Sequence, residues 1–300
     1  MNKGVLYAAG AYFLWGLFPL YWKLLQDVPA GQILAHRIVW SLVFVGLVLM
    51  VRRNWGWLRG ALRRPRVVLT FALSGLLLGV NWFVYIWGVN AGFIVETSLG
   101  YFINPLVNVL LGFLILKEKL RGAQWLALSV ALAGVLYLTF SYGAFPWIAL
   151  TLAFSFGFYG LIRKTAVLNS AEGLFLETAV LFLPALGFLL LQEARGVGAL
   201  AHSSMTTNLL LVGAGIVTSI PLLLFAAGAR RITLTSLGLL QYMAPTLQFL
   251  IGVLIYNEEF GLSRVIGFGL IWLALILYTA ESLLHRRHAQ PPQASAKVAP

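Results

Sequence analysis

The sequence predicts an all-α integral membrane protein with ten transmembrane helices in two inverted-topology five-helix repeats. Three observations support this fold class: the apolar composition, the long apolar runs, and the uneven distribution of Lys and Arg. Of the 300 residues, 60% are hydrophobic and only 10% are charged, and the mean hydropathy is +0.89. Ordinary soluble domains contain about 25% charged residues. This composition therefore excludes a soluble enzyme, a disordered chain and a conventional nucleic-acid-binding protein.

The apolar runs are too long and too continuous for the strands of a membrane β-barrel. Barrel strands alternate in polarity over about ten residues, whereas a spanning helix needs about 20 apolar residues. Only these two structures satisfy all backbone hydrogen bonds in lipid. The first run, behind Lys3, exceeds the core of a signal peptide and is expected to be retained. The ten predicted spans are residues 4–24, 32–51, 67–89, 94–116, 122–140, 146–162, 172–191, 208–228, 233–256 and 263–284.

The distribution of Lys and Arg predicts the orientation of the chain. If the N-terminus is cytoplasmic, 17 of the 21 Lys and Arg residues fall in cytoplasmic segments. Such a positive-inside bias is a strong topology signal. We therefore expect a multi-pass protein of the cell inner (plasma) membrane, with both termini in the cytoplasm. The same bias accounts for the net charge of +12 without a nucleic-acid partner.

The two halves of the sequence resemble each other. A Thr-Ser-Leu-Gly block at residues 97–100 recurs at 235–238, and each copy precedes the spacing Pro-x6-Gly-x5-Glu. Because each repeat holds an odd number of spans, the second copy enters the membrane from the opposite side, as in many secondary transporters. The predicted division is a first five-helix repeat at 1–141, a second at 142–286, and a disordered cytoplasmic tail at 287–300.

Six longer segments carry a more specific pattern, which extends over about residues 3–284. They are LWGLFPLYWKLL (14–25), AHRIVWS (35–41), NWFVYIW (81–87), SLGYFINP (98–105), PLLLFAAGARR (221–231) and GLLQYMAPTLQFLIGV (238–253). These segments resemble the RarD branch of the EamA family, within the drug/metabolite transporter superfamily. The resemblance implies two five-helix halves around a central cavity lined mainly by spans one, three, four, six, eight and nine. It also implies export of amino acids, drugs or other small metabolites.

The fourth span carries a polar face. Glu96, Gly100, Asn104 and Asn108 recur every four residues, so they form a stripe that turns by about 40° per step on an α-helix. Pro105 frees a backbone carbonyl within this stripe. We expect Asn104 and Asn108 to face the substrate; the alternative is that both hydrogen-bond to neighbouring helices.

The ninth span repeats this arrangement. Gln241, Tyr242 and Gln248 surround Pro245, and their polar face is expected to oppose that of span four across the pseudo-two-fold axis. Amides from both halves suit a neutral or zwitterionic ligand that carries donors and acceptors. Packing between helices is again the alternative.

Further cavity candidates lie on spans one, three and six. Asn81 and Tyr85 are one helical turn apart on span three, and Trp15 and Tyr159 could stack on a substrate. Aromatic residues are also enriched at membrane interfaces, and Trp22 is predicted to belong to such an interfacial belt.

Two ionisable residues near the outer face are candidates for a gate or anchor. A charge at the bilayer centre costs roughly 2.5–3.5 kcal/mol, so Arg37 and Glu96 are expected to pair with each other. Lys23 lies closer to the end of its span, where its long side chain can reach the interface.

Three other carboxylates are expected to have structural roles. Glu177 is predicted to pair with Arg163 or Lys164. Glu118 and Glu258 follow spans four and nine and are predicted to be solvated or capping carboxylates, with a gate salt bridge at each end as the alternative.

Sequence motifs for ATP hydrolysis and metal catalysis are absent. The chain contains no G-x-x-x-x-G-K-[ST], no H-E-x-x-H and no cysteine, so we expect no ATPase subunit, no cofactor and no metal. The leading hypothesis is a secondary transporter that exports amino-acid-like or aromatic small molecules by alternating access around a midplane cavity. An integral-membrane enzyme acting on a lipid-borne substrate and a passive channel are the alternatives. The expected partners are a small-molecule substrate and the lipid bilayer, and a ten-span inverted repeat can be complete as a monomer.

Overall fold

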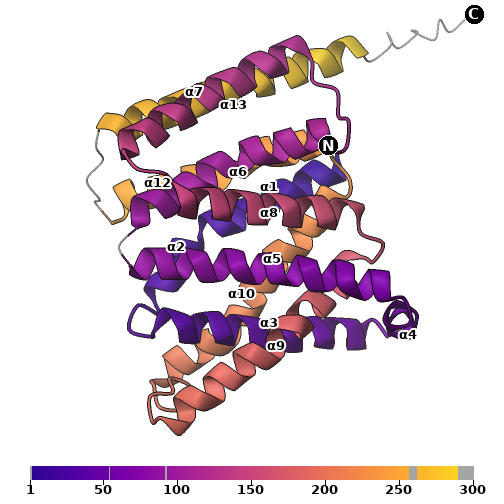
Figure 1. Ribbon diagram of the computed structural model, residues 1–300, viewed down its shortest axis with the longest axis vertical. Coiled ribbons are helices and arrows are strands. Elements are labelled where there is room, and N and C mark those ends of the chain that lie inside the picture. Colours follow the sequence, from indigo (N-terminus) through magenta and orange to yellow (C-terminus); the bar gives the residue numbers. More distant parts are fainter. Residues whose placement is uncertain (1, 54, 92, 257–261, 290–300) are drawn as a thin grey trace, which may run out of the picture.

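The computed structural model describes residues 2–53, 55–91, 93–256 and 262–289. Within these ranges every regular element is an α-helix (Figure 1). The helices are α1 (Lys3–Gly16), α2 (Phe18–Lys23), α3 (Ala30–Val51), α4 (Gly56–Leu62), α5 (Pro65–Asn90), α6 (Ile94–Leu114), α7 (Gly122–Tyr142), α8 (Trp147–Thr165), α9 (Ser170–Ala194), α10 (Met205–Ala229), α11 (Leu234–Gln241), α12 (Met243–Leu254) and α13 (Leu262–Ala289).

The protein is a multi-pass membrane protein. In the described part of the chain, eight helical stretches are long and apolar enough to cross a membrane. The predicted spans at 146–162 and 263–284 are helical, as α8 and α13, but lie outside this set. The last turn of α8 carries the charged residues Arg163 and Lys164, and the apolar part of α13, Val265–Tyr278, is short. The number of ten spans therefore stays a prediction.

Two of the spanning stretches are broken. The first consists of α1 and α2, which meet at Leu17 just before Pro19. The other consists of α11 and α12, which meet at Tyr242 just before Pro245. A proline inside a helix removes a backbone hydrogen bond, so both breaks leave backbone groups that other side chains can contact.

The helices pack in a defined order. α7 packs against α13, α3 against α9, and α6 lies between α8 and α11. Figure 1 shows α7 with α13 at one end of the molecule and α3 with α9 at the other. α1 packs against α10 and against both parts of the broken span α11–α12. Elements of the two halves of the chain are therefore interleaved around the centre.

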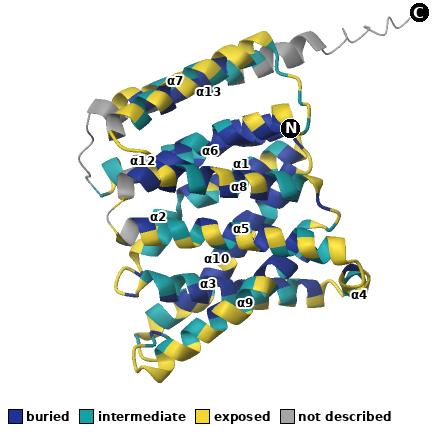
Figure 2. Ribbon diagram, in the orientation of Figure 1, coloured by how far each residue is buried: buried dark blue, intermediate teal, exposed yellow. Residues whose placement is uncertain are grey.

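Burial follows this order. The helices at the centre, such as α6 and α8, show many buried residues, whereas α7 and α13 show many exposed ones (Figure 2). Large apolar side chains such as Leu69, Leu183 and Phe140 are mostly exposed. An exposed apolar exterior is the surface that a protein in lipid presents to acyl chains.

The last helix extends further towards the C-terminus than predicted. α13 continues to Ala289, beyond residue 287, where the disordered tail was expected to start. The apolar pattern marks the spanning part of a helix but not its polar end. Residues 290–300 and Glu258 lie outside the described residues.

Candidate functional site

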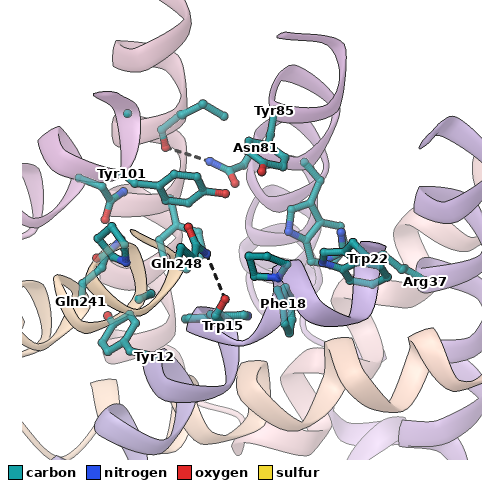
Figure 3. A pocket seen from close by; sticks show the side chains of 18 residues that line it. Tyr12, Trp15, Phe18, Trp22, Arg37, Asn81, Tyr85, Tyr101, Gln241 and Gln248 are labelled. Atoms are coloured by element: carbon teal, nitrogen blue, oxygen red, sulfur yellow. Dashed lines mark hydrogen bonds between the residues drawn. The ribbon is translucent and has the colours of Figure 1, made fainter. Parts of the chain in front are cut away.

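A cavity of about 270 Å³ lies at the centre of the molecule. The broken span α1–α2, the helices α5, α6 and α8, and the broken span α11–α12 supply its walls, together with one residue of α3 (Figure 3). Among the described residues, none from α10 lines it, although the resemblance implied a wall from span eight. The lining residues are Tyr12, Trp15, Phe18, Pro19, Trp22, Arg37, Asn81, Trp82, Tyr85, Gly100, Tyr101, Asn104, Leu152, Phe156, Gln241, Ala244, Pro245 and Gln248.

The structure brings most of the predicted cavity residues together. Those that line the cavity are Trp15, Asn81, Tyr85, Asn104, Gln241 and Gln248. Asn108, Tyr159 and Tyr242 are fully buried and lie outside the lining. Their side chains pack behind the lining and contact neighbouring helices.

A chain of amides connects the central helices. Asn104 Nδ2 donates to Ala153 O on α8 at 2.7 Å. Asn108 Nδ2 donates to Asn104 Oδ1 at 3.1 Å and to Gln241 Oε1 at 3.0 Å. Asn108 therefore fixes the two cavity amides on α6 and α11 and makes the interhelical contact considered as the alternative. The Asn108 side chain can reach Gln241 because α6 and α11 cross closely: a Cβ added to Gly238 would lie only 2.9 Å from the Cβ of Asn108.

Asn81 and Gln248 also line the cavity, and the NH2 group of each side chain donates to a neighbouring helix. Asn81 Nδ2 donates to Leu152 O at 2.9 Å and to Ser155 Oγ at 3.0 Å. Gln248 Nε2 donates to Trp15 O at 3.1 Å, next to the break between α1 and α2. Figure 3 shows these side chains around the cavity. Each amide keeps a carbonyl oxygen that can accept a hydrogen bond from a ligand.

An aromatic layer closes one end of the cavity. Tyr12 and Trp15 have ring centroids 5.5 Å apart, and Phe225 lies 6.1 Å from Tyr12 and 5.6 Å from Trp15. Tyr159 stacks on Phe225 at 5.7 Å, and its hydroxyl donates to Glu177 at 3.4 Å. Tyr159 is thus part of the packing beneath the cavity rather than of its lining.

Tyr242 also has a packing role. Its hydroxyl donates to Phe102 O at 3.2 Å, which joins the break between α11 and α12 to α6. Since Tyr242 neighbours Gln241 on a helix, the two side chains point in different directions. The polar stretch on span nine therefore contributes Gln241 to the cavity and Tyr242 to a helix contact.

Arg37 lines the cavity and lies among aromatic rings. Its Nε donates to Thr218 Oγ1 on α10 at 3.0 Å. The centre of its guanidinium is 4.8 Å from the ring of Trp22 and 4.7 Å from that of Trp82. Trp22 therefore belongs to the cavity rather than to an interfacial belt as predicted.

The expected ion pair between Arg37 and Glu96 is not among the ion pairs that the described residues form. Glu96 Oε1 instead accepts from the backbone N–H of Ile148 at 2.7 Å, at the start of α8. A helix N-terminus carries a partial positive charge that stabilises a carboxylate. Glu96 thereby acts as a cap on α8, which is why it does not need Arg37 as a counter-ion.

The buried Glu177 and the half-buried Glu118 also have structural roles. Glu177 Oε1 lies 3.4 Å from Arg163 Nη1, which confirms the predicted pairing. Glu118 accepts from the backbone N–H groups of Leu234 and Thr235 at 2.6 and 3.0 Å, which confirms its predicted capping role. In the described ranges, no group of three or more His, Asp or Glu side chains could hold a metal ion.

Sequence reasoning missed several aromatic lining residues. Tyr12, Phe18 and Trp22 were not among the predicted cavity residues, yet together with the predicted Trp15 they recur at intervals of three or four residues. This spacing places them on one helical face, and it could have identified them before the structure was known. Tyr101, beside Gly100 on α6, carries no comparable signal.

Comparison with known proteins gives a consistent result. The model of the EamA-like transporter family matches residues 2–140 and 146–280. Protein RarD of Streptomyces exfoliatus is 50% identical, covering 96% of this chain and 92% of that protein. The uncharacterized transporter YojE of Bacillus subtilis (strain 168) is 51% identical, covering 95% and 96%. A solved structure described as "Crystal structure of protein" shares the fold, with a TM-score of 0.70 at 21% identity, covering 94% of this chain and 99% of that one.

Proposed function

The chain belongs to the EamA-like transporter family, and from this premise we propose that it is a secondary transporter that exports small metabolites or drugs. Alternating access around the central cavity is the proposed mechanism. The observation that carries the proposal is the cavity itself, to which the matching helices α6 and α11–α12 of the two halves both contribute amides. Transporter sites commonly lie near the midplane at the interface between two repeats.

The packing order supports the inverted repeat. Matching each of the first five predicted spans with the span five places later pairs α1–α2 with α8, α3 with α9, α5 with α10, α6 with α11–α12, and α7 with α13. When the members of each pair are exchanged, the contact of α1 with α10 corresponds to the contact of α8 with α5. The contact of α3 with α10 becomes that of α9 with α5, and that of α6 with α8 becomes that of α11–α12 with α1. All of these contacts occur, and the pairs α3–α9, α6–α11 and α7–α13 are each exchanged with themselves. Two halves with equivalent packing can adopt two arrangements of similar free energy, which alternating access requires.

The position of the cavity supports an outward-facing arrangement, given cytoplasmic termini in the inner membrane. Asn81 and Tyr85 lie in the second half of α5, Gly100 lies in the first half of α6, and Asn104 lies at the middle of α6. With the N-terminus inside, Asn81, Tyr85 and Gly100 belong to the outer half of the membrane and Asn104 to its centre. The aromatic layer of Tyr12, Phe225 and Tyr159 then lies on the cytoplasmic side of the cavity.

Polar contacts strengthen this cytoplasmic closure. Lys164 Nζ donates to Ala229 O at 3.3 Å and also to Ile232 O, so it ties α8 to the end of α10. Glu118 ties the end of α6 to the start of α11. Opening towards the cytoplasm would have to break these contacts. A closed end of this kind favours a carrier over a passive channel, which needs a continuous polar path.

Counterflow in proteoliposomes tests the proposal. The reconstituted protein is assayed with labelled amino acids, aromatic metabolites and amphenicol drugs, and thermal unfolding with the same compounds reports binding. We expect saturable counterflow that is lost in Asn104→Ala and Gln241→Ala. It should persist in Gln192→Ala, a matched amide on α9 outside the cavity lining.

Other outcomes distinguish the alternatives. Flux that rises linearly with concentration and shows no counterflow would indicate a channel. A covalently changed product would indicate an enzyme. Absence of saturable flux for the whole panel, with the protein folded and oriented, would contradict the proposed export of such compounds.

A further inference from the structure

We propose that the transported substrate is an organic anion, and that its carboxylate binds to Arg37 beside Trp22 and Trp82 in the cavity wall. This inference rests on the proposed function, because it assigns a substrate class to the same cavity. It departs from the neutral or zwitterionic ligand that the amides alone suggest.

The charge of the cavity wall is the first argument. Among the described residues, Arg37 is the one charged residue in the lining, and no Asp or Glu lines the cavity. The buried carboxylates of the described residues are engaged elsewhere, since Glu96 caps α8, Glu172 accepts from Asn169 at the start of α9 and Glu177 pairs with Arg163. The cavity wall therefore has a net positive charge.

The surroundings of Arg37 are the second argument. Arg37 is only 9% exposed, and its hydrogen bond to Thr218 is donated by Nε. Among the hydrogen bonds that the described residues make, none uses its two Nη groups. Trp22 and Trp82 lie against the guanidinium and orient it through cation–π contacts. An oriented guanidinium with free N–H groups matches the two oxygens of a carboxylate.

The energetic cost of a buried charge is the third argument. Arginine remains protonated in proteins, so Arg37 cannot avoid this cost by losing a proton. The aromatic faces and one hydroxyl compensate only part of the lost hydration, and an intramembrane ionisable residue commonly marks a substrate path. A carboxylate in the cavity would supply the counter-ion that this part of the protein lacks.

The rest of the lining indicates what the anion carries. Phe18 lies 6.0 Å from the centre of the Arg37 guanidinium, and Trp15, Tyr101 and Phe156 add aromatic surface elsewhere in the lining. The volume of about 270 Å³ suits a ligand of one or two rings. Gln248 keeps a free acceptor at the opposite wall. We therefore expect a small aromatic or apolar carboxylate, with a hydrogen-bond donor as an additional recognition group.

Matched pairs of acids and amides test the inference. The probes are phenylacetate with phenylacetamide and indole-3-acetate with indole-3-acetamide, titrated into the purified full chain by calorimetry and thermal unfolding. We expect each acid to bind at least about tenfold more tightly than its amide, since hydrogen bonds between charged groups are roughly twice as strong as neutral ones. In Arg37→Gln this preference should fall to about twofold or less.

Two further variants make the test specific. Lys23→Gln removes an equal charge from α2 outside the lining, where Lys23 Nζ lies 5.3 Å from the Tyr256 ring, and it should keep the acid preference. Arg37→Lys keeps the charge but loses the planar fork, and it should retain only part of the preference. If Arg37→Gln does not fold, Arg37→Lys and the acid–amide comparison on the wild-type protein still decide.

Three results would overturn the inference. They are amides that bind the wild-type protein as tightly as the acids, an acid preference that persists in Arg37→Gln, and acids that do not bind at all. If a neutral compound nevertheless shows saturable counterflow, the substrate class is wrong while the transport function stands. If no compound shows saturable flux, the transport function itself fails.

Discussion

The buried ion pair between Arg163 and Glu177 gives a quantitative prediction. The two side chains are 1% and 0% exposed, and Ser74 Oγ donates to Glu177 Oε1 at 2.6 Å. Arg163 also lies against the ring of Phe71 and donates to Ser170 O. Removing one partner of a buried pair leaves an uncompensated charge and costs about 3–5 kcal/mol. We expect Glu177→Gln to lower the free energy of unfolding by this amount.

The double variant separates a pairing effect from a packing effect. Replacing both residues by apolar ones of similar size, as in Arg163→Met with Glu177→Leu, removes both charges and is often nearly neutral. We therefore expect the double variant to be more stable than either single variant. Glu193→Gln serves as the control, because the Glu193–His202 contact is 53% and 61% exposed and should contribute at most about 1 kcal/mol.

Denaturant unfolding in a defined detergent measures these free energies. Single variants within about 1 kcal/mol of the wild-type protein would show that water or lipid headgroups hydrate the pair. A double variant that loses the sum of the two single losses would show that packing, not pairing, determines stability here. Either result would refute the reasoning.

Three further predictions concern the cavity and its closure. Asn108→Ala should lower stability by about 0.6–2 kcal/mol and weaken ligand binding, because it frees both cavity amides; unchanged binding in a titration would contradict this. Gly238→Ala, whose Cβ would lie 2.7 Å from a carbonyl oxygen of α6, should cost about 1–3 kcal/mol in unfolding experiments. Gly269→Ala, with nothing within 4 Å, should not lose stability. Lys164→Gln removes a charged donor whose hydrogen bonds are worth about 1.5 kcal/mol or more. In a protein that carries Ala8→Cys at this fully buried position, the substitution should raise the rate of maleimide labelling from the cytoplasmic side about tenfold. Equal labelling rates with and without Lys164 would show that Lys164 does not stabilise the cytoplasmic closure.

The sequence predicted the helices and the amides of the cavity wall because both depend on local patterns. Apolar runs locate membrane helices, and a polar residue within a run has to face protein or water. Asn81, Asn104 and Gln241 could be identified in this way. Periodicity does not show which neighbour covers a given face, however, so it could not distinguish Asn104 in the cavity from Asn108 beneath it. That distinction depends on the crossing of α6 with α11, whose residues are far apart in the chain.

The pairing of Arg37 with Glu96 was wrong for a related reason. Depth in the membrane predicted that the two residues lie at similar levels, and opposite charges at one level are expected to pair. In the structure, Glu96 accepts from a backbone N–H at the start of α8, and Arg37 donates to a hydroxyl on α10. Neither of these two groups carries a formal charge, so counting charged residues could not reveal these contacts.

The buried and half-buried polar residues of this protein divide into two groups according to the hydrogen-bonding capacity that they have left. Glu118 and Glu177 each accept several hydrogen bonds from the protein, and both lie away from the cavity. Arg37 and Asn81 each make contacts with neighbouring helices yet retain donors or an acceptor at the cavity wall. Polarity in the sequence identifies both groups together, because both are costly in lipid. Only the second group can exchange protein contacts for ligand contacts, and it places a cation next to aromatic rings, which is why the cavity chemistry favours an anion.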